Sequence, residues 1–261
     1  MIRHPVGLRL DQGGSTRDQI YEAARLGARG VVLDAIGDLA PQRLGETGRR
    51  ELRHVLRTVE LALIALSLPT RRPFDTTDEL EARIRRADAA FALAYELGTG
   101  LVLVRAGQIP DEQDAARRDI YKSALSSLAD RADHRGVRLA LETGTEPGSR
   151  LRGFLDSLDH PSLAASIDPA ALLRSGTDPI ATVRDLNTWV AHAYAPLPAG
   201  SGATAPNPRG FGTPPGAIDW EEYLGALEEI GYGGFLTVWP DPASDPSGQF
   251  TKVLNRFSSL G

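Results

Sequence analysis

The sequence contains no cysteine, and this absence excludes several chemistries at once. Disulfide bonds, zinc–thiolate sites, iron–sulfur clusters and a thiol nucleophile all require cysteine sulfur. Long apolar runs are also absent: the longest run near the middle, residues 61–66, is far shorter than the roughly 20 residues that cross a bilayer. Residues 1–5 lack the apolar stretch of a signal peptide. These absences predict a cytoplasmic protein that does not interact with membranes.

An excess of positive charge is absent as well. Lys and Arg number 29 against 34 Asp and Glu, which gives a net charge of −5. Such a surface does not attract phosphate backbones or anionic lipids, so nucleic acid is not an expected partner. Hydrophobic residues make up 41% and charged residues 24%, as in ordinary soluble proteins. A sizeable hydrophobic core is therefore expected.

Short apolar runs alternate with longer amphipathic stretches, which is the pattern of parallel strands connected by helices. The predicted strands are residues 6–10, 30–34, 61–67, 101–105, 137–142, 163–168, 189–194 and 235–239. This pattern suits a closed barrel or an open doubly wound sheet. Residues 11–15, after the first strand, have neither dinucleotide-binding nor P-loop glycine spacing, which disfavours a nucleotide cofactor. The pattern does not decide between the two folds, and the missing loop favours the barrel. We predict one domain over residues 1–261, an α/β fold of the single (β/α)8 TIM barrel type.

Two of the intervening helices carry recognisable end signals. Thr76, three residues before Glu79, predicts a capping box at the start of a helix that ends at Gly98. Asp219 and Glu222 can cap the last predicted helix reciprocally.

Residues 195–217 interrupt the alternation. They are rich in Pro, Gly, Ala and Ser, and Arg209 is their only charged residue. A loop of this length inside a compact domain is usually a functional lid or a mobile insertion. It follows the seventh predicted strand, on the side where barrel active sites are built.

Acidic residues end two neighbouring predicted strands. Glu142 ends the fifth strand and Asp168 ends the sixth. Two such carboxylates can share a hard divalent cation such as Mg²⁺ or Mn²⁺, or raise one another's pKa so that one becomes a general acid or base. The alternative is that each caps the following helix or pairs with an arginine. The residues themselves leave this choice open.

Four segments carry a resemblance to a known family: Leu-Ala-Leu-Glu at 139–142, Ser-Ile-Asp-Pro at 166–169, Ile-Asp-Trp at 218–220 and the segment 231–238. The chain resembles, over essentially its whole length, the xylose isomerase-like barrel family of sugar isomerases and epimerases. In that family a Glu, an Asp, a His and a Glu after strands five to eight bind one divalent metal, and the two Glu residues move a proton between sugar carbons. The resemblance implies that Glu142 is the catalytic base and that Glu142 and Asp168 are metal ligands.

The chain departs from the family pattern at the remaining ligand positions. Tyr194 stands in place of the usual His, and Trp239 in place of the last Glu. His192 is retained in the seventh strand, whereas a further His of many sugar epimerases is replaced by Ala171. Asp241 could supply the second base if it turned into the site. Any Mg²⁺ or Mn²⁺ is therefore expected to be weakly bound or absent.

The aromatic residues at the former metal-ligand positions, together with two arginines, could contact a substrate. Tyr194 and Trp239 could stack on a sugar, or simply fill the volume of a lost metal. Arg105 and Arg209 could bind a carboxylate or phosphate on a ligand, or be solvated or paired with an acid. We predict Arg105, His192, Tyr194, Arg209 and Trp239 as substrate-binding residues. The other histidines are expected to be structural or on the surface: His4, His54, His134 and His160.

The leading hypothesis is a sugar isomerase or epimerase that acts on a sugar or related polyhydroxy carbonyl compound, with Glu142 as the base. The second is a barrel that binds a carbohydrate-like ligand without turnover. A metal-dependent endonuclease is disfavoured by the acidic balance and the five histidines. A lyase that uses one base remains open. The expected partner is a small sugar-like molecule, and the sequence is compatible with a homo-oligomer.

Overall fold

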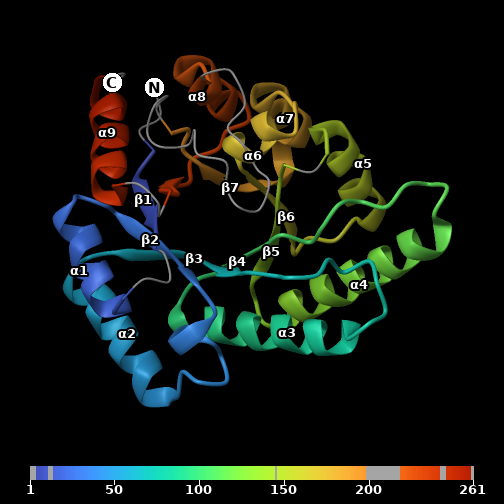
Figure 1. The fold of residues 1–261 in the computed structure, drawn as a ribbon, viewed down its shortest axis with the longest axis horizontal. Helices are drawn as coiled ribbons and strands as arrows, with labels where there is room; N and C mark the ends of the chain where they lie inside the picture. The colour runs from blue at the N-terminus through green and yellow to red at the C-terminus, as the bar shows by residue number, and fades with distance from the viewer. Residues whose placement is uncertain (1–3, 11–13, 145, 198–217, 242–244, 260–261) are drawn as a thin grey trace.

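The apolar runs form the strands of a closed barrel, in which eight parallel strands pair in chain order (Figure 1). The structure is a computed structural model that describes residues 4–10, 14–144, 146–197, 218–241 and 245–259. The strands are β1 Val6–Arg9, β2 Gly30–Asp34, β3 Ala62–Leu68, β4 Leu101–Val104, β5 Arg138–Glu142, β6 Leu163–Ile167, β7 Val190–Tyr194 and β8 Leu236–Val238. Each strand begins and ends within one residue of its predicted bounds. The predicted closed barrel is confirmed, because β1 pairs with β8 and an open sheet would lack this pairing.

Helices surround the strands (Figure 1). They are α1 Thr16–Arg25, α2 Glu46–Thr58, α3 Leu80–Leu97, α4 Ala115–His134, α5 Gly148–Leu158, α6 Pro169–Arg174, α7 Pro179–Leu186, α8 Trp220–Glu229 and α9 Pro246–Ser259, with short 3-10 turns at η1 Gly37–Leu39 and η2 Asn187–Trp189. Trp220 of α8 packs edge-on against Phe257 of α9, with ring centroids 6.2 Å apart. None of the helices described is long and apolar enough to cross a membrane.

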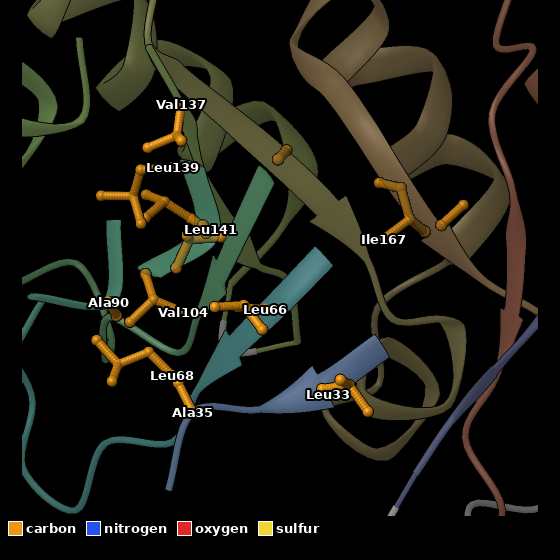
Figure 2. Close-up of a cluster of buried hydrophobic side chains, with 14 of the residues drawn as sticks. Leu33, Ala35, Leu66, Leu68, Ala90, Val104, Val137, Leu139, Leu141 and Ile167 are labelled. Carbon is orange, nitrogen blue, oxygen red and sulfur yellow. The ribbon is translucent and has the colours of Figure 1, made fainter. Parts of the chain in front are cut away.

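Alternating side chains of each strand belong to two separate layers, because successive residues of a strand point to opposite faces. Figure 2 shows part of the outer layer, in which Leu33, Leu66, Val104 and Leu141 lie on neighbouring strands and pack in the core that includes the helices. The inner layer contains smaller side chains: Val32, Ala65, Leu103, Ala140 and Ala164, together with Tyr194. The barrel is thus filled with side chains and is not a pore.

Two glycines make room for a larger side chain inside the barrel. An added Cβ at Gly7 would lie 2.2 Å from Cδ1 of Ile64, and one at Gly30 would lie 2.8 Å from Cγ1 of the same residue. Ile64 lies where the pairing of β2 with β3 shifts register. Ile64 is the residue of β3 that has no partner at this shift, and its side chain fills the space that the two glycines leave.

The end signals of the helices are correct in part. Gly98 ends α3 with φ of 86°, and the Asp219 side chain accepts a hydrogen bond from the Glu222 amide at the start of α8. The predicted capping box at Thr76 is wrong, because α3 begins only at Leu80 and no side chain caps it. The Thr76 carbonyl instead accepts a hydrogen bond of 2.7 Å from Arg83.

Replacement of Gly30 by alanine should destabilise the barrel. The new Cβ would lie 2.9 Å from the backbone oxygen of Ala62, which cannot move as a side chain can. We expect Gly30→Ala to lower the free energy of unfolding by about 1–3 kcal/mol, measured by urea denaturation. Gly225→Ala in α8 is the control, since no atom lies within 4 Å of its added Cβ. Equal effects of the two substitutions would contradict the predicted close packing.

Candidate functional site

The carboxyl ends of the strands meet around the side chain of Arg9, the last residue of β1. Its Nη1 donates hydrogen bonds to Glu142 Oε1 at 3.0 Å and to Tyr194 Oη at 2.5 Å. Its Nη2 donates to Asp34 Oδ1 at 3.0 Å and to Ser67 Oγ at 2.7 Å. Each of these nitrogens carries two hydrogens, so all four terminal N–H groups have partners. Arg9 therefore links β1 to β2, β3, β5 and β7.

The register of the strands explains this convergence. Asp34 pairs with Ser67 across β2 and β3, and Tyr194 pairs with Thr237 across β7 and β8. In parallel strands the carboxyl ends lie at the same edge, and residues that alternate inward at that edge face a common centre. Arg9 is long enough to cross this centre from β1.

An indole covers one face of the guanidinium. Cζ of Arg9 lies 3.8 Å from the centroid of the Trp239 ring, a cation–π contact at the residue after β8. The rings of Trp239 and Tyr194 pack against each other with centroids 5.4 Å apart. The guanidinium is therefore held by hydrogen bonds at its edge and by stacking on its face.

The central ion pair is buried and charged. The side chains of Arg9 and Glu142 are each 5% exposed. Burial opposes the charge of Arg9, but Tyr194, Glu142 and Asp34 outweigh it and raise the pKa of the guanidinium above its ordinary value. Burial likewise opposes the charge of Glu142, yet Arg9, Arg105 and the Tyr194 hydroxyl lower the net pKa of this carboxyl. Glu142 is thus ionised at neutral pH.

Arg105 lies next to both acids that the sequence singled out. Its Nε is 3.9 Å from Glu142 Oε2, and its Nη2 is 4.0 Å from Asp168 Oδ2. Both separations are longer than a hydrogen bond. The Arg105 side chain is 43% exposed, which makes it an accessible cation of this site.

Asp168 also has a local structural role. Its Oδ1 accepts a hydrogen bond of 2.9 Å from the Ala171 amide and so caps α6. Burial raises the pKa of the Asp168 carboxyl, although that hydrogen bond opposes the rise. Helix capping by Asp168 and arginine pairing by Glu142 are the contacts that the sequence left open as an alternative to metal binding.

His192 lies inside the barrel beneath the site and is fully buried. Its Nδ1 is 2.8 Å from Ser166 Oγ, and its Nε2 is 2.9 Å from Thr237 Oγ1. The imidazole packs edge-on against Tyr194, with centroids 4.6 Å apart. Burial lowers the pKa of His192 to about 3, so the ring is neutral. Both ring nitrogens are thus used within the protein, and His192 supports Tyr194 from below.

Arg209 and most of the predicted 195–217 loop lie outside the described residues. The backbone of Asp241 is tied to α9, because its amide donates to Gln249 Oε1 at 3.1 Å and its carbonyl accepts from Gln249 Nε2 at 3.3 Å.

Sequence reasoning missed Arg9, Asp34 and Ser67. All three lie near the carboxyl ends of predicted strands, where they interrupt apolar runs. The same criterion that selected Glu142 and Asp168, a polar residue at the end of an apolar strand, would have selected Arg9 and Asp34 too.

The closed barrel, with its polar centre at the strand ends, defines the class of the protein as a (β/α)8 barrel with a site at the usual edge. The profile of the xylose isomerase-like TIM barrel family matches residues 20–256, and the chain belongs to this family. A search of curated protein sequences finds no significant match.

Three solved structures with the same fold are similar over nearly their whole length. A xylose isomerase domain protein from Planctomyces limnophilus is 20% identical, with a TM-score of 0.80 over 99% of this chain and 96% of the other. A D-allulose 3-epimerase from Methylomonas sp., in complex with D-allulose, is 18% identical, with a TM-score of 0.75 over 99% and 98%. A 3-keto-D-glucoside 4-epimerase from E. coli is 11% identical, with a TM-score of 0.76 over 98% and 99%.

The residues at the strand ends do not fit the divalent metal that the family implies. A hard cation requires several oxygen or imidazole ligands whose lone pairs are available to coordinate it. Here Glu142 Oε1 and Asp34 Oδ1 already accept hydrogen bonds from Arg9, and Asp168 Oδ1 caps α6. The positive charge of Arg105 stands beside the other oxygens of Glu142 and Asp168. Within the described part of the chain, no three His, Asp or Glu side chains group in a way that could hold a metal.

Buried His192 should make stability depend on pH. The unfolded chain takes up a proton on this ring below pH 6.5, whereas the folded protein does so only near pH 3. Stability from this residue is therefore lost as the pH falls from about 6.5 towards 3, at roughly 1 kcal/mol per pH unit. We expect His192→Gln to flatten this part of the pH profile of the unfolding free energy. His54→Gln, at an exposed site, should keep the wild-type profile. An unchanged slope in the His192 variant would contradict the prediction.

Proposed function

We propose that the protein is a sugar isomerase- or epimerase-like enzyme that acts on a sugar or a related polyhydroxy carbonyl compound, with Glu142 as the base. The observation that carries this proposal is the ionised Glu142 carboxylate held at the strand ends by Arg9 and Tyr194. Membership of the xylose isomerase-like family supports the reaction class, as does the fold shared with sugar epimerases.

The two oxygens of Glu142 have different surroundings. Oε1 accepts hydrogen bonds from Arg9 and from Tyr194, whose hydroxyl is 2.9 Å away. Oε2 faces Arg105, at a distance beyond hydrogen bonding. A carboxylate anchored through one oxygen can direct the other at a substrate proton. We therefore assign proton transfer to Oε2.

In the proposed reaction Glu142 removes a proton from the carbon next to the substrate carbonyl. The electron pair of that C–H bond moves into the carbonyl and gives an enediolate oxygen. Return of the proton from Glu142 to the former carbonyl carbon, while the hydroxyl proton of the neighbouring carbon passes to the enediolate oxygen, completes an isomerisation. Epimerisation instead requires a proton from solvent on the opposite face of the original carbon, after which Glu142 releases its proton to solvent. Arg105 would stabilise the enediolate charge because it is the exposed cation beside Glu142.

Trp239 would form the apolar side of the substrate site, with the buried Tyr194 ring packed against it and His192 fixing Tyr194 from below. Aromatic rings stack on the C–H faces of sugars and exclude water from the reacting carbon. Substrate binding by Arg209 stays a prediction from the sequence.

Exchange of carbon-bound protons with solvent tests the proposal. In ²H₂O with D-allulose, D-tagatose or D-fructose as substrate, the wild-type protein should incorporate deuterium next to the carbonyl, observed by NMR. Glu142→Gln should slow this incorporation by about 100-fold or more, because the amide is not a base. Glu22→Gln on the exposed surface of α1 is the matched control and should not change the rate. Incorporation that is independent of Glu142 would refute its role.

A second candidate is a barrel that binds such a sugar without turnover. The specific observation in its favour is that Arg9 and Tyr194 already satisfy Glu142 Oε1 inside a nearly closed cluster. Trp239 would then be the main recognition surface.

Calorimetric titration with the same ketohexoses separates the two candidates. Binding without deuterium incorporation, weakened about tenfold by Trp239→Leu, is the result expected of a binding protein. Trp189→Leu is the control, since that indole bonds to Asp156 outside the barrel. Incorporation by the wild type would exclude this candidate.

A further inference from the structure

Four oxygen atoms from four strands surround the guanidinium of Arg9 at the barrel mouth. They belong to Asp34, Ser67, Glu142 and Tyr194, and each lies within 3.0 Å of a terminal nitrogen of Arg9. Carboxylate oxygens, assisted by hydroxyls, are the donors that hard cations prefer in proteins. The chain has therefore built an oxygen-lined cation site.

The shape of this site is that of a guanidinium. Two oxygens face Nη1, two face Nη2, and the flat face of the group lies on the Trp239 ring. A planar fork with paired donors matches this arrangement. A spherical ion would leave the indole without a matching partner.

The two carboxylates that bind Arg9 have positive charges beside them within the site. The carboxylates of Asp34 and Glu142 are 12% and 5% exposed, so each needs a nearby positive charge. Arg9 bonds to both of them, and Arg105 adds a second positive charge beside Glu142. A divalent ion that bound these four oxygens would have to displace the buried Arg9 side chain.

We propose that Arg9 is a built-in cation, which takes the place of a divalent metal ion at the barrel mouth and prevents Mg²⁺ or Mn²⁺ from binding there. This inference does not depend on the proposed proton transfer, because it concerns cation binding and stability and not turnover.

The first experiment is a Mn²⁺ titration of the wild-type protein, followed by electron paramagnetic resonance of the free ion and by thermal unfolding. We expect no stoichiometric binding and a melting temperature that 1 mM Mn²⁺ changes by less than about 1 °C. One tightly bound Mn²⁺ per chain, lost on Glu142→Gln, would overturn the proposal.

The second experiment removes the built-in cation. Arg9→Ala leaves the two carboxylates without their partner and should lower the melting temperature by roughly 5–10 °C. The vacated oxygens should then accept a replacement cation. Mn²⁺, or methylguanidinium at millimolar concentration, should restore several degrees, whereas urea at the same concentration should not. Absence of rescue by either cation would contradict the proposal.

Arg105→Ala is the matched control. It removes one positive charge from the same mouth but leaves the four hydrogen bonds of Arg9 in place. We expect this variant to bind no Mn²⁺. Equal Mn²⁺ binding by both variants would show that net charge, and not the position of Arg9, excludes the metal.

Arg9→Lys covers the case in which the alanine variant does not fold. Lysine keeps the charge but cannot bond to both carboxylates through a planar fork. Its melting temperature should fall below that of the wild type, and Mn²⁺ should not raise it. Stabilisation of this variant by Mn²⁺ would count against exclusion by a fixed cation.

Discussion

The contact between the Arg9 guanidinium and the carboxylates of Asp34 and Glu142 organises the barrel mouth. One buried cation faces two buried acids, and each of these charges would be costly in an apolar interior without the other. The hydrogen bonds to Ser67 and Tyr194 and the Trp239 ring complete the cluster. The orientation of Glu142, its ionisation and the chemistry available to it all follow from this contact.

The rest of the barrel makes this cluster possible. Below it, the inner layer consists mostly of small apolar side chains, and His192 forms hydrogen bonds to Ser166 and Thr237. Tyr194 bridges the two levels, because its ring packs in the apolar layer and its hydroxyl joins the polar one. Tyr223 of α8 donates to the Tyr194 carbonyl at 3.0 Å and ties the strand end to the outer layer. The polar centre is thus supported from below by the inner layer and from the outer layer by α8.

The sequence predicted the strands well because each one is a short apolar run buried on both faces, and this pattern depends on neighbouring residues alone. It also located Glu142 and Asp168 at the correct edge. The contacts of these acids could not be predicted in the same way. Arg9 and Glu142 are 133 residues apart in the chain, and their meeting depends on the register of several strands and on the length of one side chain. The capping box at Thr76 did not form, and the Thr76 hydroxyl oxygen, which the motif would have used as an acceptor, instead accepts from Arg83 at 3.4 Å.

The partners of Arg9 lie 25, 58, 133 and 185 residues away along the chain. Contacts of such long range form only after the intervening segments have been ordered, at a considerable entropic cost. A half-barrel made of the first four strands could place Asp34 and Ser67 near Arg9, but it would lack Glu142 and Tyr194. The cluster therefore requires strands from both halves of the sequence. In this chain the site is complete only when the ring of strands is complete.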